Sequence, residues 1–420
     1  MRNASLWRAL LGIERAVIED IEIDEDRGCL VAHVRPKKGA RRRCGRCQRR
    51  APWYDRGEGR RRWRGLDLGT VRVWLEAEMP RVSCPEHGPT VVAVPWARHN
   101  AGHTGDFDEQ VAWLATHCSK TAITELMRIA WRSVGSIIAR VWADVEAVHD
   151  RFANLRRLGI DEISYKRGHR YLTIVVDHDS GRLVWAAPGR DKATLSKFFD
   201  ALGAERCAKI THVSADGADW IASVVEACCP TAIRCADPFH VVRWTTDALD
   251  EVRREAWNTA RGAVNRRRAG RATGHAKQLK HARFALWKNP EHLTPRQQAK
   301  LAWIAKADPR LHRAYLLKEH LRMVFQLDYD EAVHALEVWI NWARRCRIPA
   351  FVELQRRIVK HKASILAAIE HGLSNGRIES VNTKIRLITR IAFGFASPEA
   401  LIGLAMLSLG GHPPILPGRK

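Results

Sequence analysis

Three carboxylates, far apart in the sequence, have the residue types and settings of a site that cleaves phosphodiesters. Asp161 and Asp216 each follow an apolar run that predicts a strand, and Glu379 opens a stretch that predicts a helix. We therefore expect each acid at the end of an element, where it can project into a cleft. Two divalent ions held by such acids can activate a nucleophile and stabilise the leaving oxygen. The acids predict two Mg²⁺ or Mn²⁺ ions, with Asp161 bridging the pair and Asp216 and Glu379 completing one shell each.

The chain around these acids is strongly basic, with a net charge of +24 over 420 residues and a pI near 10.2. Two stretches carry much of this excess. Arg27–Arg64 holds 15 Lys and Arg against two acids, and Arg253–Lys288 holds 11 against one. A solvated surface is the ordinary explanation of a single charge run. Two such stretches in a chain this far from neutrality favour contact with nucleic acid, so we expect DNA as the partner.

Length and composition place the chain among folded proteins of several domains. It is 46% hydrophobic and 28% charged, which is typical of globular proteins with buried cores. No apolar run approaches the roughly 18 residues of a membrane span, and the first residues lack the apolar core of a signal peptide. We expect no membrane association and a cytoplasmic, nucleoid-associated protein. The ten cysteines are then expected to be metal ligands or small buried residues.

Two short motifs near the N-terminus predict a zinc site. Cys44 and Cys47 are separated by two residues, and so are Cys84 and His87. Such pairs form knuckles that place four soft donors around one Zn²⁺ in a tetrahedron. Buried cysteines beside an unrelated surface histidine are the alternative. A closed four-ligand site has no open position for water, so we expect this structural Zn²⁺ to stabilise the domain rather than to catalyse.

Residues 105 to 150 have apolar positions at spacings of three and four, which is typical of amphipathic helices. A break at Trp131–Ser133 separates the last two predicted helices, with Ser133 as the expected N-cap. Two short helices around a tight turn form a helix-turn-helix candidate, whose second helix would run from Val134 to about Ala143. The turn lacks the glycine often found there, so a plain helical linker is the alternative. The candidate DNA contacts in this segment are Arg132, Ser133 and Arg140.

The next segment predicts a ribonuclease-H-like core. Strands are expected at Leu158–Ile163, Tyr171–Val176 and Leu183–Ala187, followed by a helix at about Lys192–Leu202, a strand, a helix and a strand that ends at Cys235. Acids close the first and the fourth of these strands. This is the element order of a ribonuclease-H-like fold, whose third acid lies on a later helix, as Glu379 would.

The chain is thus expected to be a multidomain α+β and α/β protein. A helical pattern fills most of the long interval between Asp216 and Glu379, which predicts an all-helical insertion in the core. The insertion could fill space in the fold, or it could contact DNA through Arg253–Lys288. The expected segments are a zinc ribbon at 1–100, a helix-turn-helix at 101–150, the first part of the core at 151–245, the insertion at 246–370 and the second part of the core at 371–420.

The motifs and their order closely resemble DDE transposases of bacterial insertion sequences, in the zinc-ribbon-bearing ISL-three family. The resemblance covers nearly the whole chain, and its most specific motifs are Asp237–Val242 and Ser374–Asn382. It departs mildly at Ser380, where glycine is common. The resemblance implies that the three acids bind magnesium, that the N-terminal modules recognise the element's terminal inverted repeats, and that the helical insertion splits the core. It also implies strand hydrolysis, transfer of the 3′-hydroxyl to target DNA and a homo-oligomer in the synaptic complex.

Other residues near these motifs are candidates for supporting roles. Asp237 and His240 are expected beside the cleft, where they could support the acids or position DNA; a structural histidine is the alternative. The cations that follow Glu379 could hold phosphates, or could be ordinary surface charges, and they are Lys384, Arg386 and Arg390. Two rival functions stay open: a ribonuclease-H-like nuclease or resolvase that cuts without joining, and a DNA-binding regulator with an inactive core.

Overall fold

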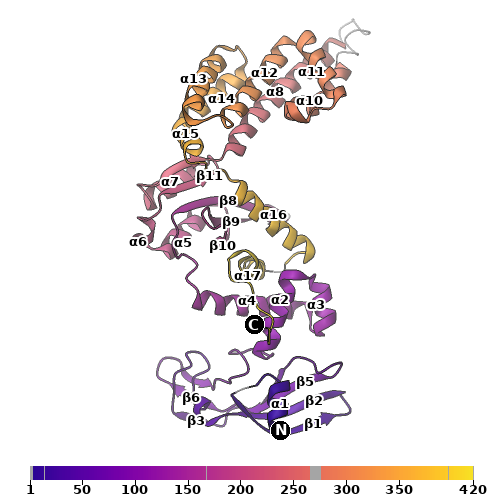
Figure 1. Cartoon of the computed structure of the whole chain (residues 1–420), viewed down its shortest axis with the longest axis vertical. Coiled ribbons are helices and arrows are strands. Elements are labelled where there is room, and N and C mark those ends of the chain that lie inside the picture. The colour runs from indigo at the N-terminus through magenta and orange to yellow at the C-terminus, as the bar shows by residue number, and fades with distance from the viewer. Residues whose placement is uncertain (1–2, 14, 167, 265–275, 396, 420) are drawn as a thin grey trace. The chain divides into compact units, whose positions relative to one another are not determined.

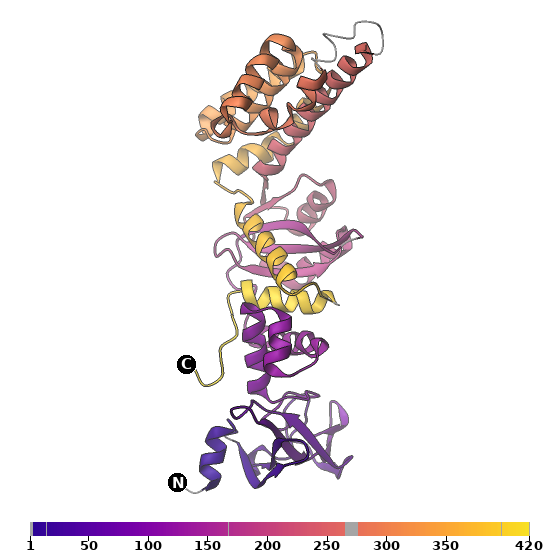
Figure 2. The ribbon, with the colours of Figure 1, turned by 90° about the vertical axis from the view of Figure 1, so that its right-hand side faces the viewer.

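The computed structural model describes residues 3–13, 15–166, 168–264, 276–395 and 397–419. The chain divides into two compact units, one built from residues 1–150 with 387–420 and the other from residues 151–386 (Figures 1 and 2). Part of the basic stretch Arg253–Lys288 falls at 265–275, outside the described residues. Within the described part of the chain, no helix is both long and apolar enough to cross a membrane.

The first unit begins with two small β-sheets after helix α1 (Asn3–Leu10). One sheet has the order β1-β2-β5-β4, and its core side chains include Trp63 and Leu75. The other has the order β3-β6-β7 and carries Cys84 at the end of β6. The strands are β1 (Ala16–Asp24), β2 (Cys29–Pro36), β3 (Trp53–Asp55), β4 (Arg60–Arg64), β5 (Arg72–Glu78), β6 (Arg81–Cys84) and β7 (Gly88–Val91).

Three helices follow, α2 (Gly105–His117), α3 (Lys120–Met127) and α4 (Trp131–Val148). The helix-turn-helix is confirmed as α3 and α4, but the expected N-cap is wrong: α4 begins at Trp131 after Ala130, and Ser133 lies inside its first turn. Arg128 ends α3 with a φ of 53°, so it adopts the left-handed conformation that glycine often provides in such turns. The tight turn thus ends three residues earlier than the sequence pattern predicted, and Arg128 takes the left-handed position that glycine often occupies.

The last helix, α17 (Pro398–Leu409), packs against α4 and α2. The ideal Cβ positions of Gly135 and Gly403 come within 3.3 Å of Ala400 and Ile138, so both helices use glycine to approach closely. Residues 387–420 therefore belong to the unit that contains the helix-turn-helix. This differs from the expected segment 371–420, which placed them with the core.

The second unit is built on a five-stranded mixed sheet with the order β10-β9-β8-β11-β12. β8, β9 and β10 are antiparallel neighbours, and β11 and β12 run parallel to β8. This is the topology of the ribonuclease-H-like core that the element order predicted, and the helices α5–α7 lie between its strands in sequence. Their bounds are β8 (Arg157–Lys166), β9 (Arg170–Asp177), β10 (Leu183–Pro188), α5 (Lys192–Leu202), α6 (Ala204–Cys207), β11 (His212–Ala215), α7 (Asp219–Cys228) and β12 (Ile233–Ala236).

A bundle of helices is inserted after β12 (Figure 2). It begins with α8 at Pro238, earlier than the expected residue 246, and its core contains the fully buried Trp339 and Phe351. The chain returns to the sheet through α15, which packs against β12 and leads into α16 (Gly376–Ile391). The helices are α8 (Pro238–Val264), α10 (Arg283–Trp287), α11 (Pro295–Ala307), α12 (Pro309–Val324), α13 (Tyr329–Arg345), α14 (Pro349–Lys360) and α15 (Lys362–Glu370).

Candidate active site and zinc centre

Strand register brings two of the predicted acids next to each other. In the parallel pair β8–β11, Ile160 is the partner of Ala215, so Asp161 and Asp216 are the next residues on adjacent strands. Asp216 directly follows β11, as expected. Asp161 does not end its strand: β8 continues to Lys166 because β9 pairs with it along that length. The expectation of a strand end was therefore wrong for Asp161, which instead lies where β8 leaves its parallel partner.

Asp161 is partly buried and held by two donors. The backbone N–H of Glu162 donates to Asp161 Oδ1 at 2.8 Å, and the Asn382 amide donates to Oδ2 at 2.7 Å. Burial raises the pKa of Asp161 above its ordinary value, although both hydrogen bonds and the nearby His240 favour the ionised form. Because burial disfavours the charged form of this carboxylate, a cation bound against it would stabilise that form.

Asp237 and His240 lie beside these acids: Asp237 directly precedes α8, and His240 lies in its first turn. Asp237 accepts a hydrogen bond from the backbone N–H of Phe239 at 3.1 Å. His240 Nδ1 lies 2.9 Å from Asp237 Oδ2 and 3.8 Å from Asp216 Oδ1. The contact with Asp237 and the charges of Asp216 and Asp161 together raise the pKa of His240. The structure thus brings His240 together with three acids, which favours a supporting role over a purely structural one.

Glu379 lies in the first turn of α16, and its side chain is exposed. The helix is anchored on the sheet by the residues around Glu379. Ile378 is fully buried against Gly159 of β8, where an ideal Cβ would lie 2.2 Å from Ile378 Cδ1. Arg377 donates to the carbonyl oxygens of His178 and Asp179, the latter at 3.0 Å. Glu379 therefore directly follows Ile378, whose side chain can pack on β8 only because residue 159 is glycine.

A buried chain of hydrogen bonds ends at Asn375, the residue directly before the same helix. His178 Nε2 and Ser214 Oγ are 2.6 Å apart, and Ser214 donates to Asn375 Oδ1 at 2.6 Å. Burial lowers the pKa of His178 to about 4, so the imidazole is neutral and can donate from Nε2. The sequence analysis missed His178, Ser214, Asn375 and Asn382 as site residues. The only available signal was that both asparagines lie inside the Ser374–Asn382 motif.

The three acids form no tight cluster by themselves. Among the described residues, only one group of three or more His, Cys, Asp or Glu side chains has all its ligand atoms within 4.8 Å, and it is not this one. Asp161 and Asp216 are adjacent in register, whereas Glu379 comes from a helix joined to β8 through Asn382. The donors are all hard carboxylate oxygens, which suit Mg²⁺ or Mn²⁺. The residues therefore fit a divalent-ion site in their chemistry.

The group whose ligand atoms all lie within 4.8 Å of one another is the predicted zinc quartet of Cys44, Cys47, Cys84 and His87. The Sγ atoms of Cys47 and Cys84 are 3.7 Å apart, and His87 Nδ1 lies 3.6 Å from Cys84 Sγ and 3.8 Å from Cys44 Sγ. Tetrahedral bonds of about 2.0 to 2.3 Å place ligand atoms roughly 3.5 to 3.8 Å from one another. The contact with His87 lowers the pKa of Cys84 to about 6, which favours the metal-binding thiolate.

Removing one ligand should abolish this zinc site. We expect one zinc per wild-type chain and, in Cys84→Ala, less than about a tenth of that, because metal binding and folding are coupled in such small modules. Metal analysis of freshly purified, unchelated protein measures both values. Cys118→Ala is the matched control, since Cys118 lies outside the quartet and is partly exposed. A wild-type protein without zinc would show that these three cysteines and His87 do not hold a metal.

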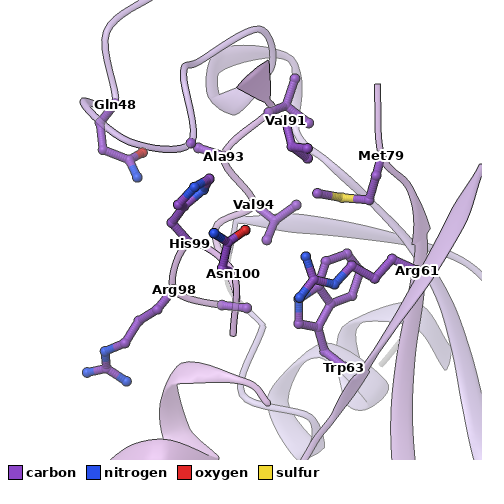
Figure 3. A pocket seen from close by; sticks show the side chains of 13 residues that line it. Gln48, Arg61, Trp63, Met79, Val91, Ala93, Val94, Arg98, His99 and Asn100 are labelled. Carbon is purple, nitrogen blue, oxygen red and sulfur yellow. The ribbon is translucent and has the colours of Figure 1, made fainter. Parts of the chain in front are cut away.

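A small cavity lies beside the first zinc knuckle, where Figure 3 shows His99 close to the segment of Ala93 and Val94. Its volume of about 10 Å³ leaves room for one water at most. The ideal Cβ position of Gly45 lies 2.6 Å from both His99 Nδ1 and the Val91 carbonyl oxygen. The residue after Cys44 must therefore be glycine for the knuckle to pack, and the cavity is a packing feature rather than a ligand pocket.

The predicted DNA contacts differ in their surroundings. Arg132 is exposed at the start of α4, and Ser133 is half-buried beside it. Arg140 makes two hydrogen bonds to the buried Asp108, at 3.1 and 3.2 Å, which gives it a structural task. The remaining three candidates all lie on α16 and are exposed, and they are Lys384, Arg386 and Arg390.

Comparison with known proteins adds three family matches. Residues 158–404 match a family described as transposase, residues 92–142 a helix-turn-helix domain of transposase family ISL3, and residues 40–87 a zinc finger of the transposases of IS204, IS1001, IS1096 and IS1165. The chain is 67% identical over 436 positions to the transposase for insertion sequence element IS1557 of Mycobacterium tuberculosis, covering 100% of this chain and 98% of the relative. It is 26% identical over 406 positions to the transposase for IS1001 of Bordetella parapertussis, covering 95% and 96%.

Proposed function

This chain belongs to the ISL3 family of DDE transposases, and from that premise we propose that Asp161, Asp216 and Glu379 hold two divalent ions for DNA cleavage and joining. One observation carries the assignment. Asp161 and Asp216 follow paired residues on adjacent parallel strands, and Asn382, on the helix of Glu379, binds Asp161 at 2.7 Å. Two of the acids are thus neighbours at the point where β8 and β11 separate, and the helix that carries the third acid is hydrogen-bonded to Asp161.

The ions, when bound, supply an activated water and stabilise the leaving oxygen of the phosphodiester. Asp161, Asp216 and Glu379 would hold the ions, and Asp161 lies between Asp216 and the helix of Glu379 in the contacts described above. Asn382 holds one Asp161 oxygen and so orients the other oxygen for binding. The half-buried His240 lies within 3.8 Å of Asp216 and supports that carboxylate, or the phosphate opposite it, with Asp237 fixing its ring.

The reaction has two steps at the same acids. Hydrolysis of a strand at the element's end exposes a 3′-hydroxyl, and that hydroxyl then attacks a phosphodiester of the target DNA. Neither step needs a covalent bond to the protein or an organic cofactor. Lys384, Arg386 and Arg390 are exposed on the helix of Glu379 and are placed to hold phosphates of the bound strands.

Recognition of the element's ends is assigned to the first unit. It contains the zinc quartet and the helix-turn-helix, and the exposed Arg132 and the half-buried Ser133 begin the second helix of that motif. The N-terminal residues of a recognition helix are the ones that reach base edges in the major groove. Terminal inverted repeats and target DNA are the proposed partners, on the bacterial nucleoid, with several copies of the chain in the synaptic complex.

A strand-transfer assay tests the proposal against its two rivals. The probe is a duplex that carries the DNA flanking this gene, already cut to expose the 3′-hydroxyl, mixed with supercoiled plasmid and Mg²⁺. We expect covalent joining of the labelled strand to the plasmid. Cleavage of uncut ends without joining would favour a nuclease or resolvase, and binding without cleavage or joining would favour a regulator.

A further inference from the structure

A buried acid joins two parts of the first unit, which we name the β module (residues 16–104) and the helical module (residues 105–148 with 398–409). Asp108 of α2 is completely buried. It accepts two hydrogen bonds from Arg140 of α4 and forms an ion pair with Arg98 of the β module at 3.6 Å. Arg98 also reaches Asp144 of α4 at 2.5 Å. The side chain of Arg98 therefore connects the β module to two helices.

A second acid makes a similar connection elsewhere on the same boundary. Asp67 of the β module forms ion pairs with Arg64 and with Arg128, the residue that ends α3. Arg128 also donates to the carbonyl oxygen of Thr70 at 3.0 Å. The guanidinium of the buried Arg64 lies 5.4 Å from the ring centre of Phe107 in α2. Arg128 thus binds α3 to the β module, and Arg98 of the β module binds α4.

The segment between the modules is itself docked on β4. The backbone N–H of Arg64 donates to the carbonyl oxygen of Gly102, and that of Thr104 donates to the carbonyl oxygen of Arg64, both at 2.9 Å. Arg61 donates to the carbonyl oxygen of Ala101 at 2.8 Å. Thr104 then caps α2 by accepting from the N–H of Phe107. The connection is therefore an added strand-like segment that leads directly into a capped helix, with no free linker.

We infer that Arg98 and Arg128 clamp the β module and the helical module into one body, so that the element's end is read by both modules at one fixed spacing. This inference rests on the proposed recognition of ends by the first unit. Two DNA-binding modules joined by a flexible linker can both stay bound when the two DNA segments that they contact are moved apart. Two rigidly joined modules cannot. Arg98 and Arg128 are then positioning residues that determine specificity without touching DNA.

Duplexes with altered spacing test the clamp in the full-length chain. Footprinting first locates the segments of the end DNA that the protein protects, and one to five base pairs are then inserted between them. Each inserted pair moves one segment by about 3.4 Å and turns it by about 34°. Wild-type protein should lose at least about tenfold in affinity with one inserted pair, because simultaneous contact by two modules contributes about 10²- to 10⁴-fold.

The double variant Arg98→Gln/Arg128→Asn should bind the natural end more weakly, but lose less than about threefold per inserted pair, since the segment docked on β4 is then left to hold its modules together. Asparagine tolerates the left-handed backbone at position 128. Lys209→Gln/Arg356→Gln is the matched control: it removes two charges from exposed ion pairs in the second unit and should keep the wild-type spacing profile. If the double variant lacks zinc or unfolds, Arg128→Asn alone is compared, because that side chain is 38% exposed.

The possible results separate this inference from the proposed function. A flatter spacing profile in the clamp variant than in the wild type and the control supports the clamp. Equal spacing penalties in all three proteins, or a wild type that tolerates every insertion, would overturn it while leaving end recognition intact. Wild-type protein that binds end DNA no better than random DNA would instead contradict the proposed recognition of ends.

Discussion

Asp161→Asn, Asp216→Asn and Glu379→Gln should each lower DNA cleavage and strand transfer by about 10³-fold or more. The substitutions keep side-chain shape but remove the charge of a proposed metal ligand, and residues that act as one unit lose most of their effect when any member is removed. DNA binding should persist, because these acids lie in a basic chain and contribute no phosphate contact. Gel-based cleavage and transfer assays, with a binding assay beside them, measure the separation.

Glu162→Gln is the matched control for this series. Glu162 is the neighbour of Asp161, but its carboxylate forms an ion pair with Arg190 at 3.2 Å. We expect this variant to cut and join nearly normally. Full activity in Asp161→Asn, or an inactive Glu162→Gln, would show that the wrong acid was chosen.

Gly159→Ala should lower cleavage by about 10²-fold although no catalytic group is changed. A Cβ at position 159 would lie 2.2 Å from Ile378 Cδ1 and 2.9 Å from His178 Nε2, and both neighbours are buried. The first turn of α16 must then shift, and it carries Glu379 with it. A displacement of about 1 Å in a catalytic group can cost about 10² in rate. Single-turnover cleavage of end DNA measures the loss, while zinc content and end binding should be unchanged.

Two further variants make this result interpretable. Gly262→Ala places a Cβ in open space on α8, so it should be neutral for cleavage. Gly159→Ala combined with Ile378→Ala removes the side-chain atoms that clash and should recover part of the lost rate. The proposed anchoring of α16 is contradicted if Gly159→Ala cuts at the wild-type rate, or if the double variant is slower than both single variants.

Local signals explain why much of the core could be predicted. The helix expected at Lys192–Leu202 has those bounds in the structure, because Asp191 accepts from the N–H of Thr194 at one end and Gly203, with a φ of 82°, follows the other. The zinc ligands were predictable because each knuckle lies within four consecutive residues. The strand order was predictable because the alternation of strands and helices restricts the possible topologies.

Contacts between distant residues could not be predicted in the same way. The hydrogen-bond chain from His178 through Ser214 to Asn375 joins three segments, and no spacing in the sequence indicates it. The turn before α4 was misplaced because Arg128 adopts a backbone conformation that a sequence pattern assigns to glycine. The packing of α17 on α2 and α4 could not be predicted, because the apolar residues of a helix do not indicate which other helices they contact.

The packing of α17 on α2 and α4 has a consequence for the order in which the protein is made. A ribosome delivers residues 1–150 first, but the surface of α4 near Gly135 and Ile138 remains uncovered until residues 398–409 have left the exit tunnel. The unit proposed to recognise the element's ends is therefore finished last, after residues 151–386 have been translated. A chain shortened by a premature stop would lack the helix that completes this unit, and would be a poor competitor for the element's ends.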